Sequence, residues 1–199
     1  MINLVDEANV LSPDDYIKLK NFIVNKCLCT HVETPWLTVK VRKDGNTGYY
    51  GYWTTSYEQI GLNLRNLKAT IVLNATYLLT IPQMKKTLAH EFGHHWTIGY
   101  MIENLEIPGW FDYRAPMDYY RMRGLNLKDF AKDYSKDWYH CDKEVLAEDY
   151  KHLFSPFAGE HRMKNLVGNP SAEVKARIWE LGFALRKSWE EQLRKRFNF

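Results

Sequence analysis

A short run of residues, His90-Glu91-Phe92-Gly93-His94, contains the side chains needed for zinc-assisted hydrolysis. Residues four positions apart lie on one face of a helix, so His90 and His94 can direct their imidazoles at one metal ion. Glu91 lies one step round the helix, where its carboxylate can reach a metal-bound water without coordinating the metal. Zinc lowers the pKa of such a water to about 7, which makes hydroxide available at neutral pH. The run therefore predicts a zinc site with an acid–base residue beside it.

The residues around this run favour a helix over a chance match. A strand is expected at 68–74, followed by a turn; Thr80 can then cap a helix that has Pro82 in its first turn. The apolar residues recur at helical spacing up to about residue 100: Met84, Leu88, Phe92, Trp96 and Gly99. Gly93 lowers the helix propensity, so its presence predicts that another segment packs closely beside the metal; the alternative is a helix that is merely loosened at this position.

Catalytic zinc usually has three protein ligands, so a further ligand must come from a second rigid element. A short helix is expected at 142–154, where Glu144 and Glu148 lie four apart on one face beside apolar residues. We assign Glu144 to the metal and Glu148 to the free N–H of a ligand imidazole. The alternative is a solvated acidic face with Lys143 and Lys151 as partners.

These two segments together resemble the gluzincin pattern, H-E-x-x-H followed by E-x-x-x-[DE]. The runs 90–94 and Glu144-Val145-Leu146-Ala147-Glu148-Asp149-Tyr150 look most like the peptidase domain of anthrax-lethal-factor-like enzymes, and the separation (144 − 94 = 50 residues) is compatible with that group. The resemblance covers roughly residues 68 to 155. It implies a zincin-like metallopeptidase fold, with an α/β part whose edge strand lines the cleft and a helical part that carries the third zinc ligand.

The oxyanion donor departs from this pattern. Lethal-factor-like enzymes have a Tyr seven residues before the metal-binding Glu, whereas Asp137 occupies that position here. Tyr139 is the nearest Tyr and falls just before the expected helix cap at Asp142, so we favour it as the donor. His140 is a rival, because other gluzincins use a His in this role, and Tyr134 lies further away. An aromatic, polar loop on the surface would also explain all three.

The order of the expected elements predicts an α+β fold. A helix at 12–27 is followed by about three strands, 37–42, 49–53 and 68–74, the first two joined by a turn at 44–46. With 199 residues the chain is expected to form a single domain, 1–199. Residues 1–100 would form an α/β upper lobe with the metal helix, and residues 101–199 a helical lower lobe with the third ligand.

Composition narrows the range of partners. The net charge of +3, from 27 basic and 24 acidic residues, is too balanced to indicate nucleic acid or an anionic membrane as the main partner. No signal peptide or membrane-spanning run is evident, and nothing suggests a disulfide framework, so we expect a cytoplasmic protein. Secretion by a non-classical route would leave no trace in the sequence, and the oligomeric state is not specified by it.

Three further features could serve a function or pack in the core. Cys27-x-Cys29-x-His31 favours small buried thiols over a second metal site, and Cys141 either lines the cleft or packs in the core. Aromatic residues between the two ligand helices, Tyr113, Tyr119, Tyr120 and Trp138, could wall a peptide groove or pack in the core.

A last helix is expected to start near Asn169. Its apolar seam comprises Val174, Ile178, Leu181, Leu185 and Trp189, and its basic face Arg186, Lys187, Arg194, Lys195 and Arg196. A docked helix with a solvated outer face is favoured over a partner-binding or self-inhibiting tail.

The sequence therefore predicts a single-zinc endopeptidase acting on a protein or peptide. His90, His94 and Glu144 hold the metal, Glu91 moves the proton, and Tyr139 or His140 stabilises the oxyanion. Substrate would lie extended along the strand at 69–74. The alternatives are a regulatory peptidase resembling phage anti-repressor proteases, a zinc-stabilised interaction module without turnover, and, more weakly, a basic-helix nucleic-acid binder. Glu91 argues against the module, because a purely structural site does not need it.

Overall fold

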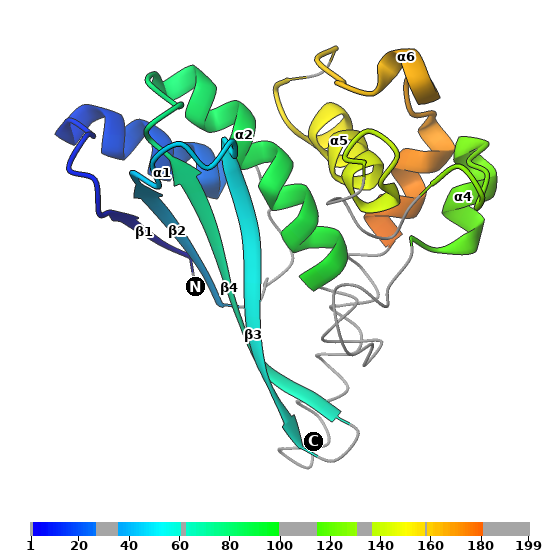
Figure 1. Cartoon of the computed structure of the whole chain (residues 1–199), viewed down its shortest axis with the longest axis horizontal. Helices are drawn as coiled ribbons and strands as arrows, with labels where there is room; N and C mark the ends of the chain where they lie inside the picture. The colour runs from blue at the N-terminus through cyan, green and yellow to red at the C-terminus, as the bar shows by residue number, and fades with distance from the viewer. Residues whose placement is uncertain are drawn as a thin grey trace.

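The protein has a mixed α+β fold, as the sequence predicts. The computed structural model describes residues 2–26, 36–60, 63–99, 115–130, 137–157 and 159–180. A twisted sheet and two long helices form one side of the molecule, and a group of shorter helices lies beside the second long helix (Figure 1).

In the described part of the chain the sheet has four strands rather than about three: β1 (Ile2–Asp6), β2 (Trp36–Arg42), β3 (Gly51–Ile60) and β4 (Asn63–Asn74). Their order is β1-β2-β4-β3, with β3 antiparallel to β4 and the other neighbours parallel. β1 was not predicted. The prediction that the turn at 44–46 joins two neighbouring strands is wrong, because β4 lies between β2 and β3.

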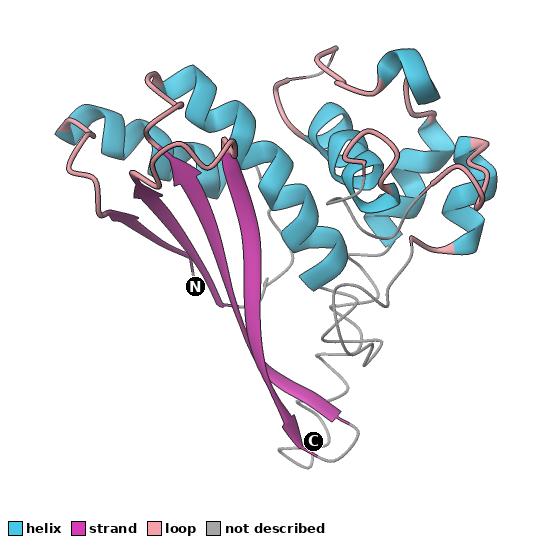
Figure 2. Ribbon diagram, in the orientation of Figure 1, coloured by secondary structure: helices cyan, strands magenta, loops and turns pink. Residues whose placement is uncertain are grey.

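The same strand order corrects the predicted position of the substrate. The strand at 69–74 is the inner part of β4, and its main chain is paired with β2 on one side and β3 on the other. It therefore has no open edge on which a peptide could add. Among the described strands, the sheet ends at β3 on the side of the metal helix, and β3 and β4 extend together beyond the rest of the sheet (Figure 2).

The first two helices form where capping and apolar spacing predict them. α1 (Pro13–Lys26) lies within the helix expected at 12–27 and buries Leu19, Phe22 and Ile23. α2 (Ile81–His94) begins with a capping box in which Thr80 and Gln83 exchange hydrogen bonds. It continues as a π-helical turn, η1 (His95–Gly99), so the helix ends close to the predicted residue 100.

The remaining helices are α4 (Met117–Arg123), α5 (Asp142–Phe154), α6 (Lys164–Val167) and a helical segment described over 172–180. The last of these begins where the final helix was expected. Val174 and Ile178 of its predicted seam are fully buried, and the Trp96 indole N–H donates to the Ile178 carbonyl oxygen (3.1 Å). The rest of the seam and the basic face lie outside the described residues.

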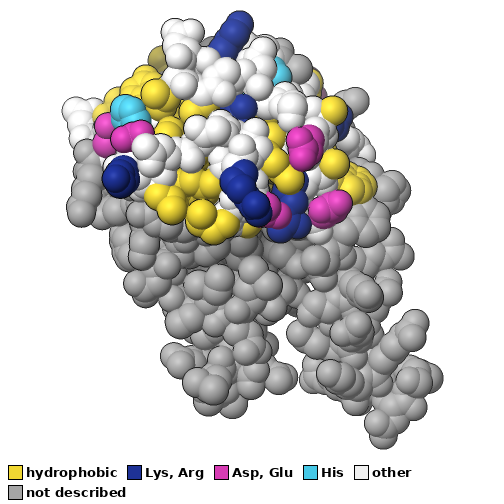
Figure 3. Space-filling view, turned by 90° about the vertical axis from the view of Figure 1, so that its right-hand side faces the viewer, with side chains coloured by type: hydrophobic (Ala, Val, Ile, Leu, Met, Phe, Trp, Pro, Cys, Tyr) yellow, Lys and Arg dark blue, Asp and Glu magenta, His cyan; other side chains and the backbone are white. Residues whose placement is uncertain are grey.

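Charges of both signs are mixed over the described surface of the helical side. In Figure 3, basic and acidic side chains lie interspersed among apolar ones. A search of the described helices finds none with the length and apolar character required to cross a lipid bilayer.

Candidate metal centre

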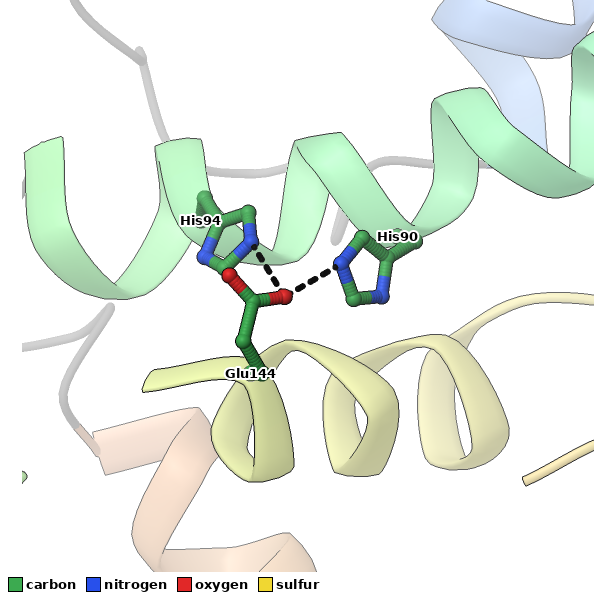
Figure 4. A group of neighbouring side chains, drawn as sticks. All are labelled: His90, His94 and Glu144. Carbon is green, nitrogen blue, oxygen red and sulfur yellow. Dashed lines mark hydrogen bonds and ion pairs between the residues drawn. The ribbon is translucent and has the colours of Figure 1, made fainter. Parts of the chain in front are cut away.

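Two helices bring three potential ligands together, as the sequence predicts. α2 presents His90 and His94 from successive turns, and α5 presents Glu144 opposite them (Figure 4). Glu144 Oε2 lies 3.0 Å from His90 Nε2 and 3.3 Å from His94 Nε2. One ligand atom from each residue lies within 4.8 Å of the other two, and all three side chains are buried.

Gly93 allows α2 and α5 to approach each other this closely. A Cβ atom at position 93 would lie 2.8 Å from the Ala147 carbonyl oxygen, 2.9 Å from Ala147 Cα and 3.2 Å from Tyr150 Cβ. Real Cβ contacts with backbone atoms are longer than this, so any side chain would push the helices apart. The close packing expected from Gly93 is confirmed, and it holds Glu144 within reach of the two imidazoles.

Glu148 lies on the other side of the His90 ring from Glu144. Its Oε1 lies 2.8 Å from His90 Nδ1, and its carboxylate also accepts hydrogen bonds from Lys151 Nζ and from the Arg162 main-chain N–H (2.8 Å). Glu144 and Glu148 are 4% and 0% exposed, so the alternative of a solvated acidic face is wrong. Lys151 does pair with Glu148, but as a buried ion pair.

The charges of this cluster depend strongly on one another. Burial opposes charge on His90, but hydrogen bonds to Glu144 and Glu148 outweigh it and raise the pKa of His90 to about 10. Burial also opposes ionisation of the two carboxylates, yet the nearby imidazoles hold the pKa values of Glu144 and Glu148 well below their usual range. The protein without metal therefore keeps a proton on His90, and a metal ion must displace it.

The donor set fits zinc. Two imidazole nitrogens and one carboxylate oxygen are a common ligand set of catalytic zinc, which leaves a fourth position for water or substrate. Glu148 accepts the Nδ1–H of His90, so the lone pair at Nε2 of this ring is directed towards Glu144 and His94 once the second proton is lost.

α5 is held in place by buried polar contacts at its start and in its middle. Asp142 accepts hydrogen bonds from the Ala115 N–H and the Tyr120 hydroxyl, and Asp149 from the Tyr119 hydroxyl and the His161 imidazole. Asp142 is the first helical residue rather than the cap, because the cap position belongs to Cys141. These contacts fix the helix that carries Glu144.

Glu91 lies beside the ligands and lines two cavities. The first, which we call the basic pocket, has a volume of about 430 Å³. Its lining includes Tyr50, Lys86, His90, Glu91, Trp138, Lys151 and Arg162. The second, which we call the strand pocket, has a volume of about 560 Å³ and reaches His94 and Glu144. It continues along β3, where its lining includes Gly51, Tyr52, Trp53 and Thr54.

Burial raises the pKa of Glu91, while the neighbouring His90 opposes the rise. A raised pKa brings a carboxylate closer to the range useful for taking up and releasing a proton near neutral pH. Glu91 thus lies beside the ligands in both pockets, and its acid–base role stays a prediction.

β3 passes directly across α2 at Glu91. A Cβ atom at Gly51 would lie 2.7 Å from Thr87 Cγ2 and 3.5 Å from Glu91 Cγ, so only glycine fits at this crossing. The Asn74 N–H donates to the Tyr50 carbonyl oxygen (2.9 Å), which places the even-numbered residues of β3 in hydrogen-bonded pairs with β4. The main-chain groups of Gly51 consequently point away from β4.

Asn74 fixes the loop before β3. Its side chain accepts hydrogen bonds from the main-chain N–H groups of Asp44 and Thr76, and donates to the carbonyl oxygens of Gly45 and Tyr49. This buried amide therefore positions the tyrosines that wall the basic pocket. The sequence identifies Asn74 only as the start of a turn.

The two described candidates for the oxyanion donor, Tyr139 and His140, do not line the pockets beside the metal ligands. The side chain of Tyr139 is exposed, and it is absent from the described residues that line the two pockets. The imidazole of His140 is held by Asp137 (Nδ1 to Oδ2, 2.7 Å) and packs near Phe130. Tyr134 lies outside the described residues. The assignment of Tyr139 stays a prediction.

Of the other candidate residues from the sequence, those that the structure describes pack in the core or line the pockets. Tyr119 and Tyr120 are buried in the core, whereas Trp138 lines both pockets and lies beside the His90 ring. Cys141 is fully buried, and burial raises the pKa of its thiol to about 12, so it packs in the core rather than in the cleft. Tyr113, Cys27, Cys29 and His31 lie outside the described residues.

The sequence also left some pocket residues without a role. Arg162 follows α5 in a turn, and nothing in its spacing from the ligands indicates that it returns to the cleft. Only the contact of its main chain with Glu148 explains this return.

Comparisons with known proteins give no family. No protein-family model matches the chain, and comparison with curated proteins and with solved structures found no significant similarity. The function must therefore be argued from the chemistry of the residues themselves.

Proposed function

We propose that the protein is a zinc-dependent endopeptidase of gluzincin type with a zincin-like fold. The observation that carries this proposal is the convergence of His90, His94 and Glu144 in one buried group, with the carboxylate of Glu91 beside it and two pockets next to Glu91. Metal ligands of a purely structural site are usually closed off, whereas this group opens to pockets large enough for peptide side chains.

Different residues of the chain bind the metal, orient a ligand and transfer the proton. His90, His94 and Glu144 hold the metal, and Glu148 orients the His90 ring. A zinc ion there supplies Lewis acidity, which lowers the pKa of water and polarises a carbonyl group. Glu91 takes the proton of the attacking water and passes it to the leaving amine, for which its raised pKa is suited.

The outer side of β3, on which the described part of the chain places no further strand, supports binding of an extended peptide. Main-chain groups of Gly51 point away from β4, and the strand pocket follows β3 from this residue onward. A peptide can add to such an edge as a further strand, with its side chains alternating between the pocket and solvent. This role replaces the one predicted for the strand at 69–74.

The test is to measure bound zinc and cleavage of a mixed peptide library. The wild-type protein should bind one equivalent of zinc and cleave peptides internally, and a chelator should abolish cleavage. Glu91→Gln keeps the ligands but removes the base, so it should bind zinc and lose about 10²–10⁴ in turnover. Absence of stoichiometric zinc in the wild-type protein would sink the proposal. Zinc without any cleavage would favour an interaction module.

A further inference from the structure

The basic pocket contains three cations, of which one has no described carboxylate partner. Lys86 pairs with Glu160, and Lys151 pairs with Glu148. Within the described ranges no carboxylate forms an ion pair with Arg162, although its guanidinium faces the pocket that also contains Glu91. The end of the cleft nearest Tyr50 therefore carries a guanidinium that no described carboxylate contacts directly, although it lies near enough to Glu91 to oppose the rise in the pKa of that carboxyl.

Two aromatic rings hold the Arg162 guanidinium in place. Its Cζ lies 5.9 Å from the centroid of the Tyr50 ring and 5.6 Å from that of Trp138. Tyr50 comes from the sheet side of the cleft and Trp138 from the segment before α5, so the guanidinium lies between the two walls. Aromatic faces attract a guanidinium but use none of its N–H donors, so these donors stay available for a carboxylate.

The main chain of Arg162 is anchored independently of its side chain. Its N–H donates to Glu148 Oε2 (2.8 Å), the same carboxylate that orients His90. The main chain of Arg162 is therefore held at a fixed position relative to the metal ligands, while the side chain itself is exposed to solvent. This combination of a fixed backbone and an available planar cation suits recognition of a carboxylate by paired hydrogen bonds.

The direction of β3 decides which part of a substrate reaches this pocket. β3 runs from Gly51 beside Glu91 towards Ile60, away from the basic pocket. A peptide added antiparallel to β3, the more stable of the two pairings, runs the opposite way. Its residues on the C-terminal side of the cleaved bond therefore lie at the basic pocket.

We propose that Arg162 determines specificity by binding a carboxylate of the substrate on the C-terminal side of the cleaved bond. This inference rests on the proposed peptidase function. The carboxylate is either an acidic side chain or the C-terminus of a short peptide. Both sources offer the same planar group with two oxygens, which matches the fork of N–H donors on a guanidinium.

The test uses three probes that carry a zinc-binding hydroxamate at the amino end of a dipeptide. Leucyl-glutamine amide is neutral, leucyl-glutamate amide has a side-chain carboxylate, and leucyl-glutamine with a free C-terminus has a terminal one. Dissociation constants are measured with the zinc-loaded protein by calorimetry, so that no turnover is needed. At least one carboxylate probe should bind about 10- to 100-fold more tightly than the neutral probe. Which of the two binds more tightly identifies the source.

Three variants test whether Arg162, and not another cation, binds the carboxylate. Arg162→Gln should remove the preference for the carboxylate, and Arg162→Lys should restore part of it. Arg121→Gln, which removes an exposed arginine of α4 outside both pockets, should keep the full preference. Thermal unfolding checks that all variants are folded.

The remaining outcomes distinguish a failure of the inference about Arg162 from a failure of the proposed function. Equal binding of the three probes to the wild-type protein overturns the inference but leaves the zinc site intact. A preference that survives in Arg162→Gln assigns the carboxylate to Lys86 or Lys151 instead. If no hydroxamate binds to the protein in the presence of zinc, the proposed function itself fails, and the inference fails with it.

Discussion

Glu148 Oε1 lies 2.8 Å from His90 Nδ1, on the side of the imidazole away from Glu144. This contact determines which nitrogen of His90 faces the other ligands. Glu148 is held in turn by Lys151 and by the main chain of Arg162, so the orientation of the ring is fixed before any metal binds. Ligand histidines that are oriented in this way bind metal more tightly than free ones.

Replacing Glu148 should weaken zinc binding without abolishing it. Glu148→Gln keeps the shape of the side chain but removes the charge that favours the Nδ1–H of His90, so the zinc affinity should fall by about 10- to 100-fold. His90→Ala and Glu144→Ala remove ligands and should abolish stoichiometric binding. Competition with a chromogenic chelator measures all three affinities, and a wild-type affinity in Glu148→Gln would show that the contact has no orienting role.

Stability must be controlled in this experiment, because Glu148 also neutralises a buried lysine. Breaking one side of a buried ion pair costs about 3–5 kcal/mol, since Lys151 is left charged in the interior. The double variant Glu148→Gln, Lys151→Met removes both charges and should recover much of this loss. Its zinc affinity should stay as low as that of the single variant if orientation of His90 is the cause.

Gly93→Ala should lower the zinc affinity, although it adds only one methyl group. The added methyl group meets Ala147 at 2.8–2.9 Å, so α5 must move away from α2 and carry Glu144 with it. Overpacking of this kind costs about 1–3 kcal/mol, of which the better helix propensity of alanine returns about 1. Metal sites tolerate displacements of only about 0.5 Å, so we expect a measurable loss of zinc affinity.

Gly124→Ala is the matched control for this substitution. Gly124 ends α4 with φ +63°, and nothing lies within 4 Å of an added Cβ atom. Alanine there is strained by about 1–2 kcal/mol but displaces no neighbour. It should therefore lower the melting temperature and leave zinc affinity unchanged. If Gly93→Ala behaved in the same way, the close approach of the two helices would not control the site.

The ligand group could be predicted because its spacing follows from helical geometry. His90, Glu91 and His94 lie within one helix, and the carboxylates of Glu144 and Glu148 lie on one face of another, so the sequence indicates both faces directly. That two carboxylates lie beside an apolar seam also predicts that they are buried, and both are.

The strand order and the far end of the cleft could not be predicted in the same way. Apolar alternation identifies 37–42 and 68–74 as strands, but it does not specify that β4 inserts between β2 and β3. The edge strand, and with it the expected site of the substrate, depends on this insertion. Arg162 reaches the cleft through a tertiary contact with Glu148, for which no spacing in the sequence is a signal.

Tyr139 can be tested cleanly because its side chain is exposed. Removing its hydroxyl group breaks no buried contact, so any effect on turnover reports catalysis. If Tyr139 turns into the cleft and donates to the oxyanion, as the sequence predicts, Tyr139→Phe should lower kcat by about 10²–10³ while zinc binding and KM stay near wild type. Unchanged kcat in this variant, with a large loss in His140→Ala, would assign the role to His140.

Because of His95, the protein should be less stable at mildly acidic pH than at neutral pH. Its ring is buried, accepts a hydrogen bond from the Trp53 indole N–H (3.3 Å), and burial lowers its pKa to about 3. In the unfolded chain its pKa is about 6.5, so between these values the unfolded state binds a proton that the folded state does not. The free energy of unfolding should therefore fall by up to about 1.4 kcal/mol for each pH unit below 6.5.

The comparison with His95→Gln isolates this contribution, because burial also lowers the pKa of His152 and raises that of Glu91. Glu144 and Glu148 have lowered pKa values and lose their stabilising effect only below about 4.5, where the unfolded carboxyls take up protons. The pKa of His90 is raised, so His90 is protonated in both states throughout most of the range from pH 5 to 6.5. Denaturant unfolding of the metal-free protein should show a shallower pH dependence in His95→Gln, which keeps an acceptor for Trp53. Equal slopes in the two proteins would mean that His95 takes up its proton without unfolding.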